Sequence, residues 1–290
     1  MPFTEVPLDI WTAAKRGLLK EVQEFVNQGL DINACQRGKV TALHEAAEAG
    51  QLDVAFWLLD YGANPNARTI PNPGEGGAYT ALHLAVQNGH TEVVGLLLQK
   101  GAKIDAKTSD GSTPLIIAAE SGRLDLVTIL RRHGGSISLC DHMKHIPFSA
   151  AVVAGHLDIA KYLLEQGSDI NHRSEPYSMT PLMFAALEKK LDQVDSLLNW
   201  GADIKVQDDR GLAALHHAVI GGAARVKKTE WIGKKPKVTE EKHENAIEII
   251  KRLLAAGADR TAKDQEGMTS LDWAKKARAQ DLIELLGKTD

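Results

Sequence analysis

The sequence predicts an all-α fold, a solenoid of about eight helix–turn–helix units joined by hairpin-like turns. One observation is a phrase that returns along the chain: Thr41-Ala-Leu-His44, Thr80-Ala-Leu-His83, Thr113-Pro-Leu115, Thr180-Pro-Leu182 and Ala213-Ala-Leu-His216. A second is its period, because Gly101, Gly134 and Gly167 follow one another at steps of 33 residues. A fixed period of this size is typical of repeat arrays, which expose long surfaces suited to binding.

Residues 80–106 show how one unit is expected to fold. Thr80 can cap a first helix, whose apolar residues recur at the i, i+3 and i+4 spacing of a helix face. Gly89 ends that helix, Thr91 begins a second helix, and Gly101 closes it. Helices of two or three turns are marginal in water on their own, so each unit must pack against its neighbours.

The opening phrase, with a downstream Gly201-Ala-Asp203 type of ending, resembles the ankyrin repeat family over nearly the whole chain. The resemblance implies a non-enzymatic module that binds proteins. It also implies that a partner meets the turn tips and the first helices, which together line the concave face. Recruitment of substrates to a modification machinery is permitted by the same resemblance.

We expect a single domain over residues 1–290, and its parts follow the repeat. They are an N-terminal capping unit 8–40, regular units 41–212, a unit with an insertion 213–268, and a C-terminal capping unit 269–290.

The period is interrupted in three places. Six residues are added around 70–77, which predicts a lengthened turn. Lys189 stands where other units have the glycine between their helices, at a cost of about 1 kcal/mol. In the seventh unit Gly222 is expected to end the first helix, and a basic insertion of 23 residues, at about 223–244, is expected to form a loop. Inserted segments often lie on the binding face of a solenoid.

Composition excludes several classes of function. The net charge of −4 gives no general attraction to nucleic acid, and no apolar run approaches the roughly 20 residues that span a membrane. The start of the chain lacks the pattern of a signal peptide, and Cys35 and Cys140 are too far apart in the repeat to pair. We therefore expect a monomer with free thiols in the cytoplasm, with the nucleus left open.

No residue pattern predicts catalysis, a cofactor or a metal. His44 belongs to the repeated phrase, as do His83 and His216. Cys140, His142 and His145 could supply three metal ligands at one turn, but a structural zinc site needs four. We interpret these three residues as ordinary polar side chains of a variable turn.

One column of the repeat changes character along the chain. Seven residues after each opening residue it reads Lys15, Glu48, Gln87, Glu120, Val153, Leu187, Ile220, Lys276. A second column on the same helix face contains Phe184 and His217. Because this position faces solvent in units two to four, its apolar residues in units five to seven require a cover.

Three covers remain open: a protein partner, the insertion with Trp231 and Ile232, or packing of the apolar residues on one another. We predict a scaffold that binds a protein of unknown identity, with a regulatory or inhibitory subunit and a substrate-recruiting adaptor as alternatives. The predicted contact residues are Met143, Val153, Tyr177, Phe184, Leu187, His217, Ile220 and Trp231.

Overall fold

The computed structural model describes residues 8–70, 77–223, 227–232, 235–240 and 244–287. The chain forms two compact units, Met1–Gly167 and Ser168–Asp290. In the described residues no helix is long and apolar enough to cross a lipid bilayer.

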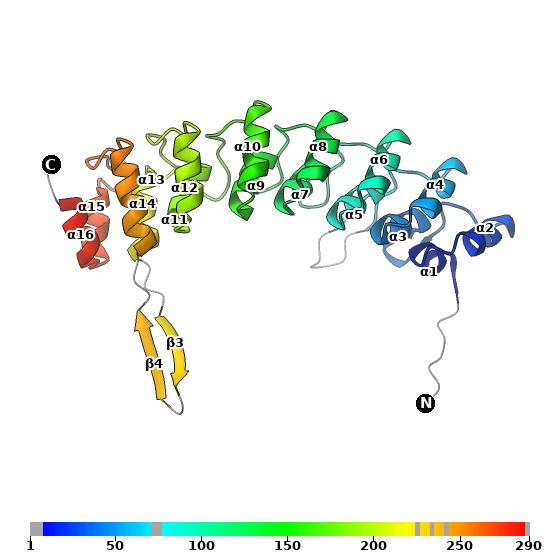
Figure 1. Ribbon diagram of the computed structural model, residues 1–290, viewed down its shortest axis with the longest axis horizontal. Helices are drawn as coiled ribbons and strands as arrows, with labels where there is room; N and C mark the ends of the chain where they lie inside the picture. The colour runs from blue at the N-terminus through cyan, green and yellow to red at the C-terminus, as the bar shows by residue number, and fades with distance from the viewer. Residues whose placement is uncertain (1–7, 71–76, 224–226, 233–234, 241–243, 288–290) are drawn as a thin grey trace. The chain divides into compact units, whose positions relative to one another are not determined.

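Each unit is a row of antiparallel helix pairs (Figure 1). In the first unit the first helices of the pairs are α1 (Ile10–Lys15), α3 (Ala42–Ala49), α5 (Ala81–Gln87), α7 (Pro114–Glu120) and α9 (Pro147–Ala154). Their partners are α2 (Leu19–Asn27), α4 (Leu52–Asp60), α6 (Thr91–Gln99), α8 (Leu124–Arg132) and α10 (Leu157–Glu165). In the second unit the pairs are α11 (Pro181–Leu187) with α12 (Leu191–Asn199), α13 (Ala214–Ala223) with α14 (Glu244–Ala255), and α15 (Ser270–Lys276) with α16 (Gln280–Gly287).

The core is formed by the apolar residues of the phrase and by the first leucine of a pair near the end of most second helices, as in Leu58-Leu59 and Leu97-Leu98. The leucine of the opening phrase is at most 1% exposed in every repeat that has it: Leu43, Leu82, Leu115, Leu182 and Leu215. Full burial of one such side chain is worth about 1.5–3 kcal/mol. The short helices are therefore stabilised by packing between neighbouring pairs, as the repeat predicts.

The threonine and the histidine of the phrase make a fixed set of hydrogen bonds. His83 is fully buried, and its Nδ1 accepts the backbone N–H of Thr80 at 3.1 Å. Its Nε2 donates to the carbonyl of Ala106, in the next turn, at 2.9 Å. His44 repeats the arrangement with Thr41 and with the carbonyl of Ala67. The histidine thus caps its own helix and ties it to the following turn, which explains its place in the repeat.

Backbone conformation between the helices also follows the prediction. Gly89 adopts a left-handed conformation with φ of 80°. Lys189, which replaces the equivalent glycine, is forced into the same region with φ of 57°. A side chain in this conformation costs roughly 1–2 kcal/mol.

The seventh repeat, the pair of α13 and α14, differs from the expectation. Gly222 does not end the first helix, because α13 continues to Ala223. Glycine is needed in this helix for close packing instead. A Cβ on Gly221 would lie 2.1 Å from the carbonyl oxygen of Leu187, and one on Gly222 would lie 2.7 Å from the Cβ of Ala246.

The insertion is not only a loop. It contains the antiparallel strands β3 (Lys227–Ile232) and β4 (Lys235–Glu240), paired from Lys227↔Glu240 to Ile232↔Lys235. The sequence contains a signal for a hairpin here, because Ile232 is followed by a glycine, and glycine is favoured as the first residue of a two-residue hairpin link. In the first unit β1 (Cys35–Gln36) and β2 (Val40–Thr41) form a short hairpin at a turn tip. Most of the predicted lengthened turn, residues 71–76, lies outside the described residues.

Candidate partner-binding surfaces

Side chains at the turn tips tie each turn to the next one within a unit. In the first unit the guanidinium of Arg68 donates to the carbonyl of Lys107. The ammonium of Lys107 in turn donates to the carbonyl of Cys140 at 2.7 Å. The second unit repeats the pattern with Arg173, Gln207 and Lys263. The surface formed by tips and first helices is therefore held in place before any partner binds.

In the second unit, three predicted contact residues lie on two helices that pack directly on each other. Phe184 and Leu187 lie on α11 and Ile220 on α13, and all three are half-buried. Gly221 brings the two helix backbones together beside Leu187. We call Phe184, Leu187 and Ile220 the apolar row.

A chain of contacts joins two further predicted residues of this unit. Tyr177 is 49% exposed at a turn tip, and the guanidinium carbon of Arg210 lies 3.9 Å from the centre of its ring. Arg210 also pairs with Asp208, where the shortest N–O distance is 2.8 Å. Asp208 Oδ2 lies 3.1 Å from Nε2 of His217, which donates to it. Tyr177 and His217 are thus linked through a charged pair that the sequence did not reveal.

His217 does not present a surface to a partner, which corrects its predicted role. The side chain of His217 is only 1% exposed, and its hydrogen bond to Asp208 is buried as well. Burial lowers the pKa of His217 to about 4, although Asp208 acts in the opposite direction. The ring is therefore neutral at pH 7, and its contribution is to hold Asp208 in position. Trp273 holds an aspartate in the same way in the last repeat, where its indole N–H donates to Asp264 at 2.7 Å.

The remaining predicted residues lie elsewhere. Met143 is 46% exposed at a turn tip, and Val153 is half-buried on α9, both within the first unit. Trp231 belongs to β3, and its side chain lies outside the described residues, as does that of Ile232. Cover of the apolar row by the insertion therefore stays one of the three alternatives that the sequence leaves open.

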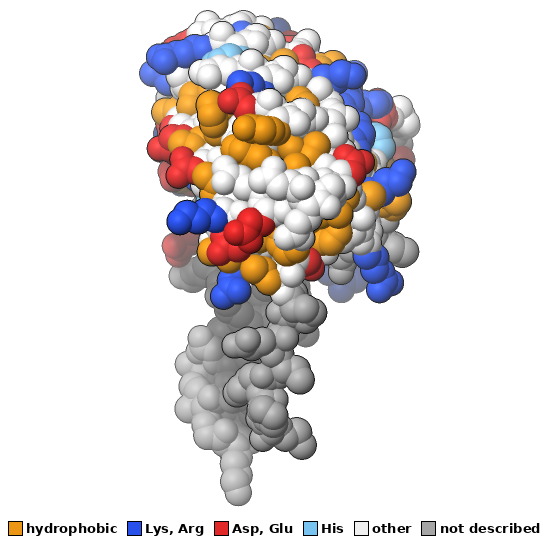
Figure 2. All heavy atoms as spheres, turned by 90° about the vertical axis from the view of Figure 1, so that its right-hand side faces the viewer, with side chains coloured by type: hydrophobic (Ala, Val, Ile, Leu, Met, Phe, Trp, Pro, Cys, Tyr) orange, Lys and Arg blue, Asp and Glu red, His pale blue; other side chains and the backbone are white. Residues whose placement is uncertain are grey.

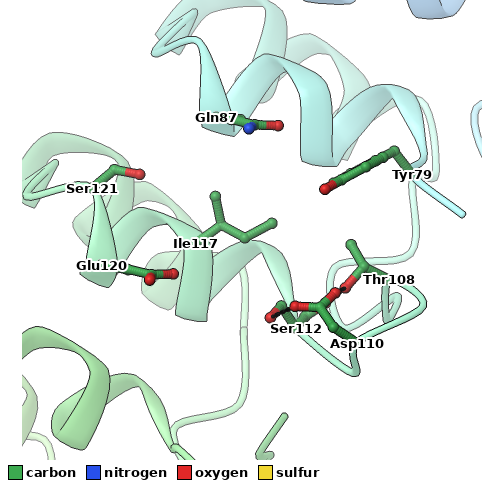
Figure 3. A pocket seen from close by; sticks show the side chains of 8 residues that line it. All are labelled: Tyr79, Gln87, Thr108, Asp110, Ser112, Ile117, Glu120 and Ser121. Atoms are coloured by element: carbon green, nitrogen blue, oxygen red, sulfur yellow. Dashed lines mark hydrogen bonds between the residues drawn. The ribbon is translucent and has the colours of Figure 1, made fainter. Parts of the chain in front are cut away.

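The first unit contains a pocket that the sequence did not predict (Figure 3). It opens between α5 and α7 and has a volume of about 170 Å³. Its lining residues are Tyr79, Gln87, Thr108, Asp110, Ser112, Ile117, Glu120 and Ser121. We call it the Tyr79 pocket. Gln87 and Glu120 belong to the polar part of the repeat column, which the sequence predicts to face solvent.

The walls of the Tyr79 pocket are fixed by hydrogen bonds. The backbone of Tyr79 is paired with Thr69, whose hydroxyl accepts from the Tyr79 N–H at 3.0 Å. Asp110 accepts hydrogen bonds from the hydroxyls of Thr108 and Ser112, the latter at 2.8 Å. Burial opposes the ionisation of Asp110, but these donors outweigh it and lower the pKa of the carboxyl. Asp110 is therefore an anion at neutral pH.

Hydrophobic side chains also gather at one end of the first unit. Figure 2 shows them at the centre of this face, surrounded by lysine, arginine, aspartate and glutamate side chains. Trp11, Phe25 and Leu30, which belong to the first helix pair and the turn after it, are half-buried.

The turn that carries Cys140, His142 and His145 shows ordinary polar contacts. His145 Nδ1 lies 3.4 Å from Asp141, and the backbone N–H of His142 donates to the carbonyl of Asp110 at 2.9 Å. Nowhere in the described residues do three histidine, cysteine or acidic side chains come close enough together to hold a metal ion. Cys140 is half-buried and is a free thiol, as is the exposed Cys35.

Comparison with known proteins gives matches to repeat proteins. A family model described as ankyrin repeats (three copies) matches residues 10–69, 70–141 and 133–208. Dog inversin (Canis lupus familiaris) is 28% identical over 136 residues, which are 42% of this chain and 12% of inversin. Mouse 2-5A-dependent ribonuclease (Mus musculus) is 39% identical over 57 residues, which are 19% of this chain and 8% of that protein. The chain thus spans a small part of the curated relatives that it matches.

Among solved structures, the human ASB11 ankyrin repeat domain superposes with a TM-score of 0.64. Its sequence identity is 24%, and the match covers 87% of this chain and 99% of that domain. At this identity the likeness shows the fold alone, and it confirms the all-α repeat fold. Because the family model matches more than half of the residues, the chain belongs to the ankyrin repeat family.

Proposed function

We propose that this chain is a non-enzymatic module that binds a protein partner through its turn tips and first helices, with the apolar row of the second unit as the main contact. The observation that carries the proposal is that Phe184, Leu187 and Ile220, on two closely packed helices, are only half-buried. Apolar side chains gathered on a rigid surface are typical of interaction sites.

The surface is suited to binding because it is preformed. Its turns are joined by side-chain bonds such as that from Gln207 to the carbonyl of Lys263, 3.2 Å long. A surface that is already ordered loses little conformational entropy when a partner binds, so more of the contact energy appears as affinity. Tyr177 and Arg210 lie on turn tips of the same unit, and both residue types are enriched at interfaces.

A substitution on the apolar row tests this proposal. Leu187→Glu places a charge in the row, and Leu191→Glu is the matched control. Leu191 is also half-buried and begins α12, the second helix of the same pair. Proteins captured by the unaltered chain are identified by mass spectrometry, and the affinity of the purified partner is then measured for each variant.

We expect Leu187→Glu to lose the partner and Leu191→Glu to retain it, with circular dichroism showing that both are folded. Equal binding by the unaltered chain and Leu187→Glu would place the interface elsewhere. If the captured partner is an enzyme, its activity with and without the chain distinguishes an inhibitory subunit from a scaffold.

A further inference from the structure

We propose that the Tyr79 pocket receives a basic side chain, arginine in preference to lysine, from an extended segment of a protein partner. The inference rests on the proposed function, because it assumes that the first-helix surface meets a protein. It adds a second contact point, on the first unit, with a defined chemistry.

The size of the pocket selects the kind of ligand. Its volume of about 170 Å³ is well below the roughly 300–1,000 Å³ of sites that hold small molecules. The pocket therefore suits a single side chain better than a metabolite. It is open to solvent at the surface of α5 and α7, so a chain running along the turn tips can reach it (Figure 3).

The lining of the pocket matches a long basic side chain. Figure 3 shows the Tyr79 ring on one side with Asp110 below it, Ile117 near the centre, and Glu120 on the opposite side, beyond Ile117. Ile117 can contact the aliphatic stem of the ligand. The Tyr79 ring can stack on a planar guanidinium, and the carboxylates can accept its hydrogen bonds.

Charge balance within the lining points the same way. Asp110 and Glu120 are the two ionisable carboxylates among the lining residues, and the lining includes no lysine or arginine. Two basic side chains of the turn tips are already engaged, since Arg68 donates to the carbonyl of Lys107 and Lys107 to that of Cys140, while His142 is the basic side chain that acts on Asp110. A ligand that carries a positive charge would compensate the two carboxylates.

The second unit shows the same three chemical groups, a tyrosine ring, a guanidinium and a carboxylate, in contact with one another. In the second unit Arg210 lies over the Tyr177 ring, 3.9 Å from its centre, and pairs with the carboxylate of Asp208 at 2.8 Å. In the first unit an exposed acidic residue, Asp110, occupies the tip instead of an arginine. The Tyr79 pocket offers an aromatic ring and carboxylates without such an arginine, although Tyr79 does not occupy the repeat position of Tyr177, which is Gly77 here.

Fluorine NMR of the full chain labelled with 3-fluorotyrosine tests the inference. The chain has four tyrosines, and Tyr79→Phe identifies the resonance of Tyr79. The probe is N-acetyl-arginine methylamide, and its uncharged isostere N-acetyl-citrulline methylamide is the comparison ligand. We expect the arginine probe to shift the Tyr79 resonance saturably, in the millimolar range, and the Tyr177 resonance to stay in place because Arg210 already covers that ring.

Variants of the carboxylates make the test specific. Asp110→Asn and Glu120→Gln should each weaken binding about two- to fivefold, as expected for exposed ion pairs. Glu92→Gln is the control, since it removes the same charge from an exposed position on α6. An unmoved Tyr79 resonance, an equal shift with citrulline, or unchanged affinity in both carboxylate variants would overturn the inference. A stronger response to the matching lysine probe would overturn the preference for arginine.

Failure of this inference is distinguishable from failure of the proposed function. If the Tyr79 resonance does not respond but Leu187→Glu still loses the partner, the module binds through the second unit without a basic anchor. If the Tyr79 resonance responds but Leu187→Glu binds normally, the pocket stands and the apolar row is wrong.

Discussion

The guanidinium of Arg210 lies 3.9 Å from the centre of the Tyr177 ring, so an exposed aromatic residue and a cation form one element of the second unit. The same guanidinium pairs with Asp208, which also accepts a hydrogen bond from the buried ring of His217. A turn tip that offers Tyr177 to a partner is thereby anchored to the inner side of α13 through three side chains.

Removing Arg210 should therefore loosen the tip. We expect Arg210→Ala to lower the free energy of unfolding of the second unit by about 1–3 kcal/mol, because the buried Asp208 loses a charge-assisted partner. Arg210→Lys keeps the charge but not the planar, two-nitrogen contact, so it should recover only part of the loss. Urea unfolding with hydrogen exchange at α11 and α13 measures both. Equal protection in all three proteins would show that the contact contributes nothing.

The pH dependence of stability should reveal His217 and His83. Burial lowers the pKa of each ring from 6.5 to about 4. The unfolded chain therefore binds more protons between these values, and stability that is complete above pH 6.5 is lost as the pH falls toward 4. At about pH 5 each ring should cost the folded state on the order of 2 kcal/mol.

His217→Gln provides the check on this assignment. The glutamine amide can still donate toward Asp208 but does not titrate, so urea unfolding at pH 7.5 and pH 5 should show a smaller loss of stability in the variant. The groups facing His217 include Asp208, Arg210 and His216, and none of them is altered. The same pH dependence in variant and parent would mean that His217 is not the titrating group.

The histidine of the repeated phrase should matter for stability and not for chemistry. His83→Ala removes the bonds to Thr80 and to the carbonyl of Ala106, leaving buried polar groups without partners. We expect a loss of about 2–4 kcal/mol, measured by urea unfolding. His133→Ala, at an exposed position directly after α8, should change the free energy by less than about 1 kcal/mol. Similar values for the two variants would contradict the role assigned to the phrase.

Lys189 offers a stabilising substitution. Its φ of 57° suits glycine better than lysine, so Lys189→Gly should raise the midpoint of urea unfolding, by up to about 1 kcal/mol in free energy. The adjacent Lys190 has φ of −91°, and Lys190→Gly should be neutral or destabilising. If glycine had the same effect at both positions, the left-handed conformation would not be the cause.

Much of the fold could be predicted because the repeat states it several times over. The phrase and the leucine pairs predicted the two helices of each repeat, and the structure has them. The glycine column predicted a left-handed conformation for Lys189, and Lys189 adopts it. Gly222 misled because glycine has two uses. It ends helices through a left-handed conformation, but in α13 it permits close approach to Ala246.

The candidate surfaces could be predicted only in part. The change from Glu120 to Leu187 along one column is visible in the sequence, and it led to the apolar row. The inward bond of His217 to Asp208 depends on how a turn folds against a helix nine residues later, which no column shows. The Tyr79 pocket is lined by residues from two neighbouring repeats of the first unit, so it appears only when α5 and α7 are placed side by side.

Site-specific photocrosslinking at Phe184 tests the central claim most directly. A photoreactive phenylalanine analogue replaces Phe184 in one protein and Phe56 in another. Phe56 is 49% exposed on α4, a second helix, so it is the same residue type at a more accessible position. The account predicts a crosslink to the captured partner from position 184 and none from position 56. A crosslink from position 56 alone would contradict binding through the first helices.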